Sequence, residues 1–199
     1  MILALDTSGG ELLLALVDGT RLVAGLARPG SRHQDVVGDA IADVAGGRLG
    51  DVDSVAVARG PGSHTGLRVG LSAAAGLAFA RRLHIYPISS LHVAAQRAFD
   101  GQGTVTAMVA AGRGRVFVQD FDVDGSRRLP RGERMLRRIE DAGQGDGVPA
   151  AEPDLMELLA PRSGNRNRGG AEALAAAVIQ VADGGEGVNY DQLTGDYGD

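Results

Sequence analysis

The feature that most constrains the fold is a glycine-rich stretch that joins two apolar segments. Residues 54–58 (SVAVA) predict a buried strand, and residues from about 67 to 82 predict a helix with Thr65 or Gly66 near its N-cap. Between them, positions 59–66 read RGPGSHTG. A strand that leads through a short loop directly into a helix is typical of proteins in which helices cover a sheet, so the chain is predicted to be an α/β protein.

The flanking segments extend this pattern over the first hundred residues. Turn residues such as Asp18-Gly19 separate the first three apolar runs, which predicts an antiparallel meander. The expected elements are strands at 2–5, 12–17 and 22–26, a helix at 33–45, the strand and helix described above, a strand at 85–88 and a helix at 90–99. This order, β-β-β-α-β-α-β-α, predicts a mixed sheet flanked by helices.

From about residue 101 the pattern starts again. Strands are expected at 105–109 and 116–121, joined through Gly112-Arg113-Gly114, and a helix is expected at 171–182. Residues 143–149 and 163–170 are rich in glycine and polar residues and predict loops. The chain is therefore divided into two lobes, residues 1–100 and a thinner, degenerate lobe of residues 101–199.

Composition excludes several classes of function. The 199 residues include no cysteine, which rules out disulfides, thiolate metal sites and a cysteine nucleophile. The N-terminus lacks the pattern of a signal peptide and no run of 18 apolar residues occurs, so a cytoplasmic protein without a membrane segment is expected. The net charge is −5, yet arginines gather at positions 127, 128, 131, 134, 137 and 138. A solvated face is the favoured interpretation of this run, and a tRNA contact is the alternative.

Two segments are candidates for binding an anion. Asp6-Thr7-Ser8 ends the first predicted strand, where amides and hydroxyls can face a phosphate and Asp6 can hold a metal or its water shell. A side-chain-stabilised turn that closes the hairpin is the alternative. The glycine loop lies before a helix N-terminus, which favours an anion, although a tight connection explains its glycines equally well. The candidate residues are Asp6, Thr7, Ser8, Gly60, Gly62, Ser63, Thr65, Gly66 and Arg68.

No catalytic or metal-binding set is predicted. The loop matches neither GxxxxGK[ST] nor GxGxxG. A helical metal site needs a second histidine one turn from the first, and Val37 stands there relative to His33. His64 has no serine or carboxylate at a spacing that pairs with it. Surface or capping roles are therefore expected for both histidines.

With these motifs in place, the chain resembles the bacterial TsaB/YeaZ family. The resemblance rests on MILALDTS at the N-terminus, RHQ at the start of the helix at 33–45, and the run SVAVARGPGSHTGLRVGLSAAAGLAFA. It extends from residue 1 to about 91, and GPGSHTGLRVG at 60–70 is its most specific part. It implies an actin/Hsp70/sugar-kinase-like, ribonuclease-H-like fold of two lobes, the second reduced.

The resemblance also implies a function. Family members are non-catalytic subunits that support a larger TsaD-type catalytic subunit, which places threonylcarbamoyl on N6 of adenosine 37 of tRNA, and a TsaE-type ATPase works with the pair. The implied partners are these two proteins, tRNA through the complex, and a second copy of the chain. The resemblance implies no cofactor bound firmly to this chain; any ATP or ADP with Mg²⁺ is expected to bind to the assembled complex. In the larger homologue paired histidines on the first helix bind the metal, whereas the helix at 33–45 has only His33.

The expected partner interface lies on two helices with apolar and small residues. Packing on the chain's own sheet is the alternative for the same faces. The interface residues are Val36, Val37, Ala40, Ile41, Val44, Gly70, Ala73 and Ala74.

The chain departs from the family pattern at two places in the second lobe. Ala110-Ala111-Gly112 replaces a DAR-type triplet, and the tail VNYDQLTGDYGD lacks the usual Pro-x-Tyr-Leu-Arg. Both differences bear on a ligand between the lobes and leave the fold expectation unchanged.

Two enzymatic functions compete with this interpretation. The Asp6-Thr7-Ser8 turn and the glycine loop suit a small ATP-dependent phosphotransferase or nucleotide hydrolase, although no second glycine motif accompanies them. A glycoprotease is disfavoured, because the sequence offers neither metal ligands nor a recognised nucleophile.

Overall fold

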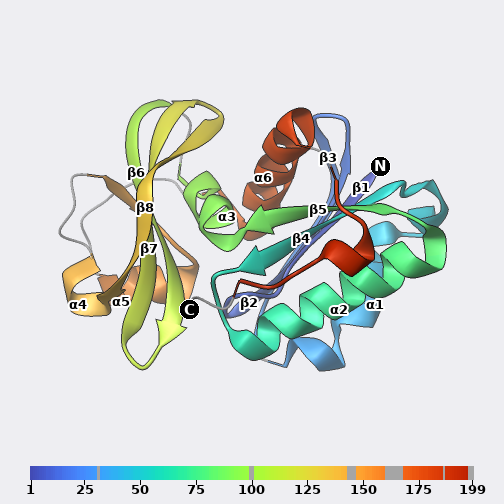
Figure 1. Cartoon of the computed structure of the whole chain (residues 1–199), viewed down its shortest axis with the longest axis horizontal. Coiled ribbons are helices and arrows are strands. Elements are labelled where there is room, and N and C mark those ends of the chain that lie inside the picture. Colours follow the sequence, from blue (N-terminus) through green and yellow to red (C-terminus); the bar gives the residue numbers. More distant parts are fainter. Residues whose placement is uncertain (31, 99–100, 143–146, 160–167, 186, 197–199) are drawn as a thin grey trace.

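The computed structural model contains two β-sheets, each with its own helices (Figure 1). It describes residues 1–30, 32–98, 101–142, 147–159, 168–185 and 187–196. Within these residues, no helix has the length and hydropathy needed to cross a membrane.

The first sheet has five strands and confirms the predicted meander. Its strands are β1 Ile2–Asp6, β2 Glu11–Asp18, β3 Arg21–Pro29, β4 Ser54–Gly60 and β5 His84–Ser89. The order is β3-β2-β1-β4-β5, with β1, β2 and β3 antiparallel and β1, β4 and β5 parallel. Because β1 lies in the centre with both faces covered, its sequence is apolar at every position before Asp6.

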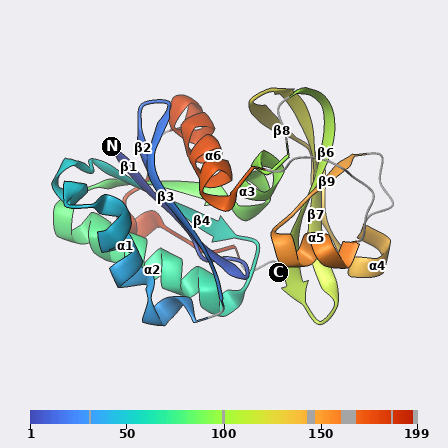
Figure 2. The ribbon, with the colours of Figure 1, turned by 180° about the vertical axis from the view of Figure 1, so that it is seen from behind.

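Helices cover both faces of this sheet. On one face lie α1 Val37–Ala45 and α2 His64–Arg81, packed on Leu3, Leu14 and their neighbours. On the other face lies α6 Gly170–Gly184, whose Leu174 and Val178 pack on Leu13 and Ala15. Figures 1 and 2 show α6 on the opposite side of the sheet from α1 and α2. The helix predicted at 171–182 is confirmed, but it packs on the first sheet and not within the second lobe, where the sequence had placed it.

The small residues of α2 face the sheet. Gly66, Gly70, Ala74 and Ala78 recur at every fourth position and are buried. Without larger side chains between them, the helix backbone lies directly on β1 and β4. The alternative of packing on the chain's own sheet is therefore the correct interpretation of this stripe.

The second sheet has four strands in the order β8-β7-β6-β9. The strands are β6 Gly101–Gly112, β7 Arg115–Gly125, β8 Arg127–Arg138 and β9 Val148–Ala150. Helix α3 Ser90–Gln96 covers one face, and α4 Ile139–Ala142 and α5 Pro153–Leu159 cover the other. The hairpin through Gly112-Arg113-Gly114 is confirmed.

Three elements of the second lobe differ from the expectation. The sequence indicated the segment of β8 only as a run of arginines and predicted no strand there. An edge strand that is exposed on both faces lacks the alternating apolar pattern from which strands are predicted. The predicted loop at 143–149 contains the start of β9, while residues 143–146 lie outside the described part. Helix α5 was not predicted. A loop was predicted at 163–170; residues 163–167 lie outside the described ranges, and α6 already begins at Gly170.

Two helix starts also differ. The helix expected at 33–45 begins at Val37, after a short 3-10 helix η1 His33–Asp35; another, η2 Arg48–Asp51, precedes β4. Helix α2 begins at His64, before the predicted start at about Leu67, and Thr65 and Gly66 follow its N-cap position within the first turn. Ser63 holds that position, because its Oγ accepts a hydrogen bond from the Gly66 amide at 3.2 Å.

Side-chain hydrogen bonds join the two lobes through Gln180 on α6. Its Oε1 accepts hydrogen bonds from the Arg128 amide at 2.9 Å, from Gln96 Nε2 at 3.2 Å and from His92 Nε2 at 3.2 Å. Its Nε2 donates to the Arg128 carbonyl oxygen at 2.8 Å. A single side chain thus connects α6, α3 and β8.

The C-terminal tail crosses the first lobe toward the second. Val188 exchanges backbone hydrogen bonds with Ile85, and Tyr190, in the short 3-10 helix η3 Tyr190–Gln192, stacks edge-on against Phe79. Asp196 donates its amide to the Arg59 carbonyl oxygen at 2.5 Å and pairs its carboxylate with Arg134 of β8. Despite its unusual sequence, the tail therefore contacts both lobes.

Candidate functional site

The two predicted anion-binding segments lie side by side at the edge of the first sheet. The turn after β1 packs against the loop between β4 and α2. Thr7 Oγ1 donates to the Gly66 carbonyl oxygen at 2.7 Å, and the Ser63 amide donates to the Ser8 carbonyl oxygen at 2.7 Å. The structure thus brings together the residues that the sequence had grouped.

The glycines of the loop permit this close contact. A side chain at Gly62 would place its Cβ 2.5 Å from the Ser8 carbonyl oxygen, and one at Gly66 would collide with the Thr7 carbonyl oxygen. Gly60 has a φ of 119° and lies against the backbone of Asp196. Each glycine therefore has a packing or conformational reason within the chain.

The amide donors of the turn are engaged by carboxylates. The Ser8 amide donates to Asp6 Oδ1 at 2.8 Å, and the Gly10 amide donates to Glu152 Oε2 at 2.6 Å. Glu152 lies between β9 and α5, more than 140 residues from the turn, and its side chain reaches it from the second lobe. Sequence reasoning missed Glu152, and its surroundings, Ala-Ala-Glu-Pro, contain no motif that could have indicated this contact.

Burial changes the acidity of both carboxyl groups. Burial raises the pKa of Asp6, although the hydrogen bond from Ser8 opposes the shift. Burial also raises the pKa of Glu152; the Gly10 amide lowers it and the nearby Asp6 raises it further. Beside them, Arg97 Nη2 pairs with Glu11 Oε2 at 2.5 Å, and His33 Nε2 lies 3.1 Å from the Gly9 carbonyl oxygen.

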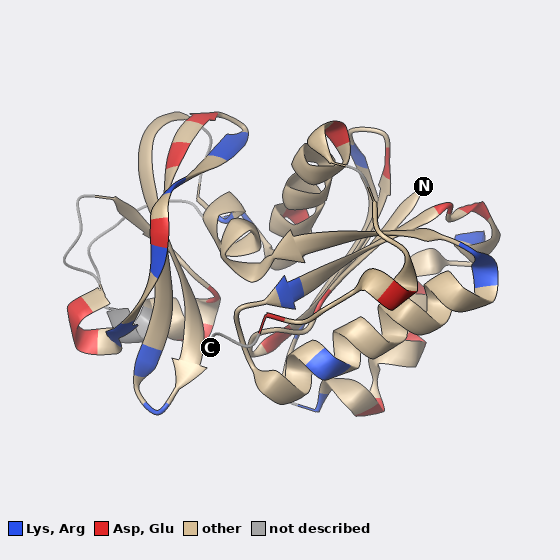
Figure 3. Cartoon of the chain, in the orientation of Figure 1, with Lys and Arg blue, Asp and Glu red and all other residues tan. Residues whose placement is uncertain are grey.

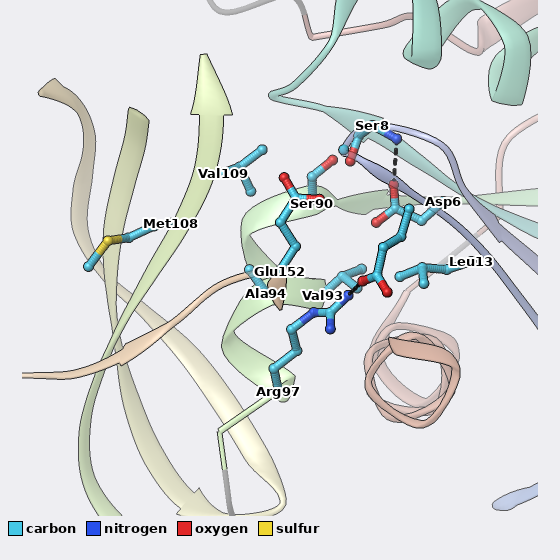
Figure 4. Close-up of a pocket in the computed structure, with 12 residues that line it drawn as sticks. Asp6, Ser8, Leu13, Ser90, Val93, Ala94, Arg97, Met108, Val109 and Glu152 are labelled. Atoms are coloured by element: carbon cyan, nitrogen blue, oxygen red, sulfur yellow. Dashed lines mark hydrogen bonds and ion pairs between the residues drawn. The ribbon is translucent and has the colours of Figure 1, made fainter. Parts of the chain in front are cut away.

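A small cavity lies between these groups and α3 (Figure 4). Its volume is about 30 Å³, enough for one or two water molecules and far too small for a nucleotide. Ser90 is buried beside it, and its Oγ has no hydrogen-bond partner among the described atoms. Asp6, Ser8 and Glu152 line the same space.

A wider groove of about 570 Å³ opens next to the cavity. Ser63 and His64 at the start of α2 form one wall, and Arg115, Phe117 and Leu136 of the second sheet form the other. The atypical Ala110-Ala111-Gly112 also lines it. Two further candidates, Thr65 and Arg68, are exposed on α2 and are not among the residues lining the groove.

No metal centre is found in the part of the chain that the structure describes: no group of three or more histidine, aspartate or glutamate side chains there is arranged to hold an ion. His33 is buried and bound to the Gly9 carbonyl oxygen, while His64 is exposed in the first turn of α2.

The predicted interface residues divide into two groups. Ala40, Ile41, Val44, Gly70 and Ala74 are buried inside the first lobe, so a partner cannot contact them in the folded chain. Val36, Val37 and Ala73 are half-buried against the same core. The expectation that these two helices bind a partner stays a prediction, but it applies to their outer side.

Comparisons of the chain with family models and with known proteins agree on its family. Residues 30–150 match the family model described as TsaD: tRNA N6-adenosine threonylcarbamoyltransferase. The chain belongs to this family. Proteins named tRNA threonylcarbamoyladenosine biosynthesis protein TsaB are 40% identical over 102 residues in Haemophilus influenzae and 31% identical over 128 residues in Escherichia coli. These matches cover 50% and 62% of the chain, and 43% and 55% of the relatives, so the matched part spans about half the length of these relatives.

The structural likeness extends over the whole chain. YeaZ from Pseudomonas aeruginosa superposes with a TM-score of 0.78 at 26% identity, covering 98% of both chains. This confirms the resemblance to the TsaB/YeaZ group and the actin/Hsp70/sugar-kinase-like fold.

Carboxylates of the chain itself occupy two of the amide donors at the turn after β1. The sequence had indicated this turn and the glycine loop as candidates for binding an anion, which requires amide donors that are free. The Ser8 and Gly10 amides are bound to carboxylates, and the side chains of Asp6 and Glu152 face the same place. Two acidic groups would repel a phosphate that approached them.

Proposed function

We propose that this chain is a non-catalytic, cytoplasmic subunit of the complex that forms N6-threonylcarbamoyladenosine at position 37 of tRNA. Its relatives are named for the biosynthesis of this nucleoside, and its likeness to YeaZ covers the whole chain. In this proposal it supports a TsaD-type catalytic subunit, together with a TsaE-type ATPase, and contacts tRNA within the assembly. Self-association through the same helices competes with that pairing.

The observation that carries the non-catalytic role is the contact between Glu152 and the Gly10 amide. Through this contact a carboxylate of the second lobe occupies an amide of the turn that the sequence had indicated as a candidate for binding an anion. ATP or ADP with Mg²⁺ therefore belongs, in this proposal, to the assembled complex. Titration calorimetry of the isolated chain with ATP and Mg²⁺ should show no binding tighter than about 1 mM, or −4 kcal/mol. Tight binding with turnover would restore the phosphotransferase alternative.

The outer side of α1 and α2 is the proposed site of the catalytic partner. Phe79 is 65% exposed there, and Gly76 has no atom near the position of a Cβ. A glycine on an exposed helix face lets a second helix approach closely. The interface is thus assigned to exposed residues on the helices that the sequence had indicated.

Reconstitution tests the role of the chain. The chain is mixed with its TsaD-type and TsaE-type partners, a threonylcarbamoyl donor and tRNA, and the modified nucleoside is measured by chromatography. We expect the chain to co-elute with the TsaD-type subunit and to raise the yield. Neither co-elution nor a higher yield would contradict the proposal.

Gly76→Arg tests the interface without disturbing the fold. A Cβ at this exposed position has no atom of the chain within 4 Å, and replacing a helical glycine favours the helix, so the variant should be at least as stable as the parent. We expect it to lose both co-elution and stimulation. Gly184→Arg, at the end of α6 and equally open, is the matched control and should retain both.

A further inference from the structure

Positive charge in this acidic chain is concentrated on β8. The strand carries six arginines and one glutamate, a net charge of +5, while the whole chain has −5 and the remainder therefore −10. Strand β8 is also an edge strand, and three of the five large apolar side chains exposed in the described residues, Leu129, Met135 and Leu136, lie on it. An edge with arginines and exposed apolar side chains is a candidate interaction surface.

The two ends of β8 have different electrostatic surroundings. At its start, Arg127 and Arg131 lie opposite Asp124 and Asp120 of β7, and Arg131 also lies 3.5 Å from Asp122. Residues directly opposite in an antiparallel pair share a face of the sheet, so these carboxylates balance the arginines.

At the other end, the residues opposite the arginines in the adjoining strand are not acidic. Arg137 lies opposite Val116, and Arg138 lies opposite Arg115. Arg113 stands at the tip of the adjoining hairpin with a φ of 53°. We name Arg113, Arg115, Arg137 and Arg138 the basic end. Figure 3 shows blue segments at this lower end of the sheet with the red residues of α4 beside them, while at its upper end red and blue lie close together on the strands.

Like charges directly opposite one another destabilise a sheet, so the pair Arg115–Arg138 needs a compensating group. The carboxylates on flanking segments are Glu133, Glu140 and Asp141, and Glu140 lies 3.4 Å from Arg138 with both side chains well exposed. A pair exposed to this degree contributes little. The nearby Arg134 is already engaged with Asp196 and with the Phe117 ring.

The basic end also borders the groove between the lobes. Arg115 and Leu136 line one wall, and the first turn of α2, with Ser63 and His64, lines the opposite wall. The N-terminus of this 18-residue helix adds partial positive charge to the wall that faces the arginines. Positive groups therefore lie on both of these walls, while the carboxyl group of Glu152, which also lines the groove, is bound to the Gly10 amide.

We propose that the basic end docks the phosphate backbone of the tRNA on which the proposed complex acts; this inference rests on the proposed function. Guanidinium groups bind phosphates in a bidentate manner, and four of them within one end of a sheet match a backbone that carries a charge at every nucleotide. The large apolar side chains exposed on β8, Leu129, Met135 and Leu136, include no aromatic ring on which a base could stack. The contact positions the RNA and reads no sequence.

The test compares two sets of arginine substitutions in the assembled complex. The test variant is Arg113→Gln, Arg115→Gln and Arg138→Gln; the matched control, Arg127→Gln and Arg131→Gln, removes arginines from the balanced end of the same strand. Binding of unmodified tRNA is followed by fluorescence anisotropy between 50 and 200 mM salt, concentrations over which phosphate contacts show their effect. Co-elution with the TsaD-type subunit and the melting temperature are recorded for each variant.

We expect the test variant to bind tRNA about tenfold more weakly. The slope of log K against log salt concentration should become shallower by about two to three, close to one for each phosphate that is no longer neutralised. The control should change affinity less than about twofold. Equal weakening in both variants, or unchanged binding in the test variant, would overturn the inference. So would competition by an acidic peptide that abolishes the difference between the variants, because the surface then serves a protein.

Failure of this inference and failure of the proposed function give different results. If the parent chain does not co-elute with the TsaD-type subunit, the proposed function fails regardless of RNA binding. If it co-elutes and stimulates modification while the test variant binds tRNA like the parent, the docking surface alone is wrong.

Discussion

The glycine loop of the first lobe and the basic end of the second are both dense in residues associated with binding phosphates, yet they differ in how those residues are used. In the glycine loop, Thr7, Ser8, Ser63 and Gly66 are bonded to one another, and Glu152 takes a remaining amide. At the basic end, by contrast, side chains stand opposite like or apolar neighbours at the edge of a sheet. Residues typical of a ligand site are internal structure in one region and open surface in the other.

This difference shows that residue type alone does not define a binding site. A glycine between a strand and a helix is equally useful for close packing and for an anion, and the neighbours decide which applies. Likewise, arginines on one strand are balanced at one end and unbalanced at the other because of the register with β7. Substitutions that separate packing from exposure therefore test the comparison directly.

The largest effect is expected for Gly66→Ala. The added Cβ collides with the Thr7 carbonyl oxygen, so helix α2 must move away from β1, at a cost of about 3 kcal/mol of unfolding free energy. Gly76→Ala, on the exposed side of the same helix, meets no atom and should raise stability by about 0.5–1 kcal/mol. Urea denaturation measures both. Similar values for the two variants would show that the loop glycines are not required for packing.

A smaller effect is expected for Arg128→Met, which tests the second lobe. Arg128 belongs to the arginine run but is fully buried, and it donates to the carbonyl oxygens of Ala95 at 3.3 Å, Ala98 at 3.1 Å and Gly125 at 2.9 Å. In Arg128→Met these carbonyl oxygens lose the hydrogen bonds from the guanidinium group, which should lower the free energy of unfolding by about 2 kcal/mol. Arg127→Met, at the exposed neighbour, should change stability by less than about 0.5 kcal/mol. An equal loss of unfolding free energy in the two variants would contradict the distinction between a buried, structural Arg128 and an exposed Arg127.

Most helices and strands of the first lobe could be predicted from the local sequence, because its core is formed by strongly apolar strands and a periodic helix. Strands such as β1 and β4 are buried on both faces, and their composition shows it directly. The second lobe was harder to predict. Strand β8 is held by pairing with β7, and its Arg-rich sequence resembles a solvated segment. The position of α6 on the first sheet depends on contacts such as Leu174 with Leu13, across some 160 residues, which no local pattern records.

The candidate site was predictable as a group of residues but not as a chemical state. The sequence indicated Asp6, Thr7 and Ser8 and the glycine loop as candidates for the same kind of ligand, and in the structure the two segments lie side by side. It could not show that Glu152 closes the turn, because a lone glutamate in a poorly patterned segment carries no signal. The buried side of α1 was also ambiguous, since a narrow apolar stripe suits a sheet and a partner helix equally well.

A pH-dependent loss of stability is expected at the junction of the lobes. Burial lowers the pKa of His92, and the nearby Arg128 adds to the shift, while the hydrogen bond to Gln180 opposes it. Because the unfolded chain then takes up the proton first, stability should fall as the pH drops below about 6.5. His92→Gln keeps a donor for Gln180 and cannot titrate, so its melting temperature should fall less between pH 7.5 and 5. Parallel curves for the two proteins would exclude His92 as the cause.

The smallest expected effect concerns Glu152 and has the opposite sign. Burial raises its pKa, so the folded chain holds this proton more tightly than the unfolded chain. Stability from this group is therefore complete below the ordinary glutamate pKa of 4.5 and is lost as the pH rises through the folded value. Glu152→Gln keeps an acceptor for the Gly10 amide but has no charge. Its melting temperature should exceed that of the parent at pH 8, and the difference should disappear near pH 4. If instead the variant is less stable at pH 8, the ionised carboxylate stabilises the turn, and the first lobe keeps a site that prefers an anion.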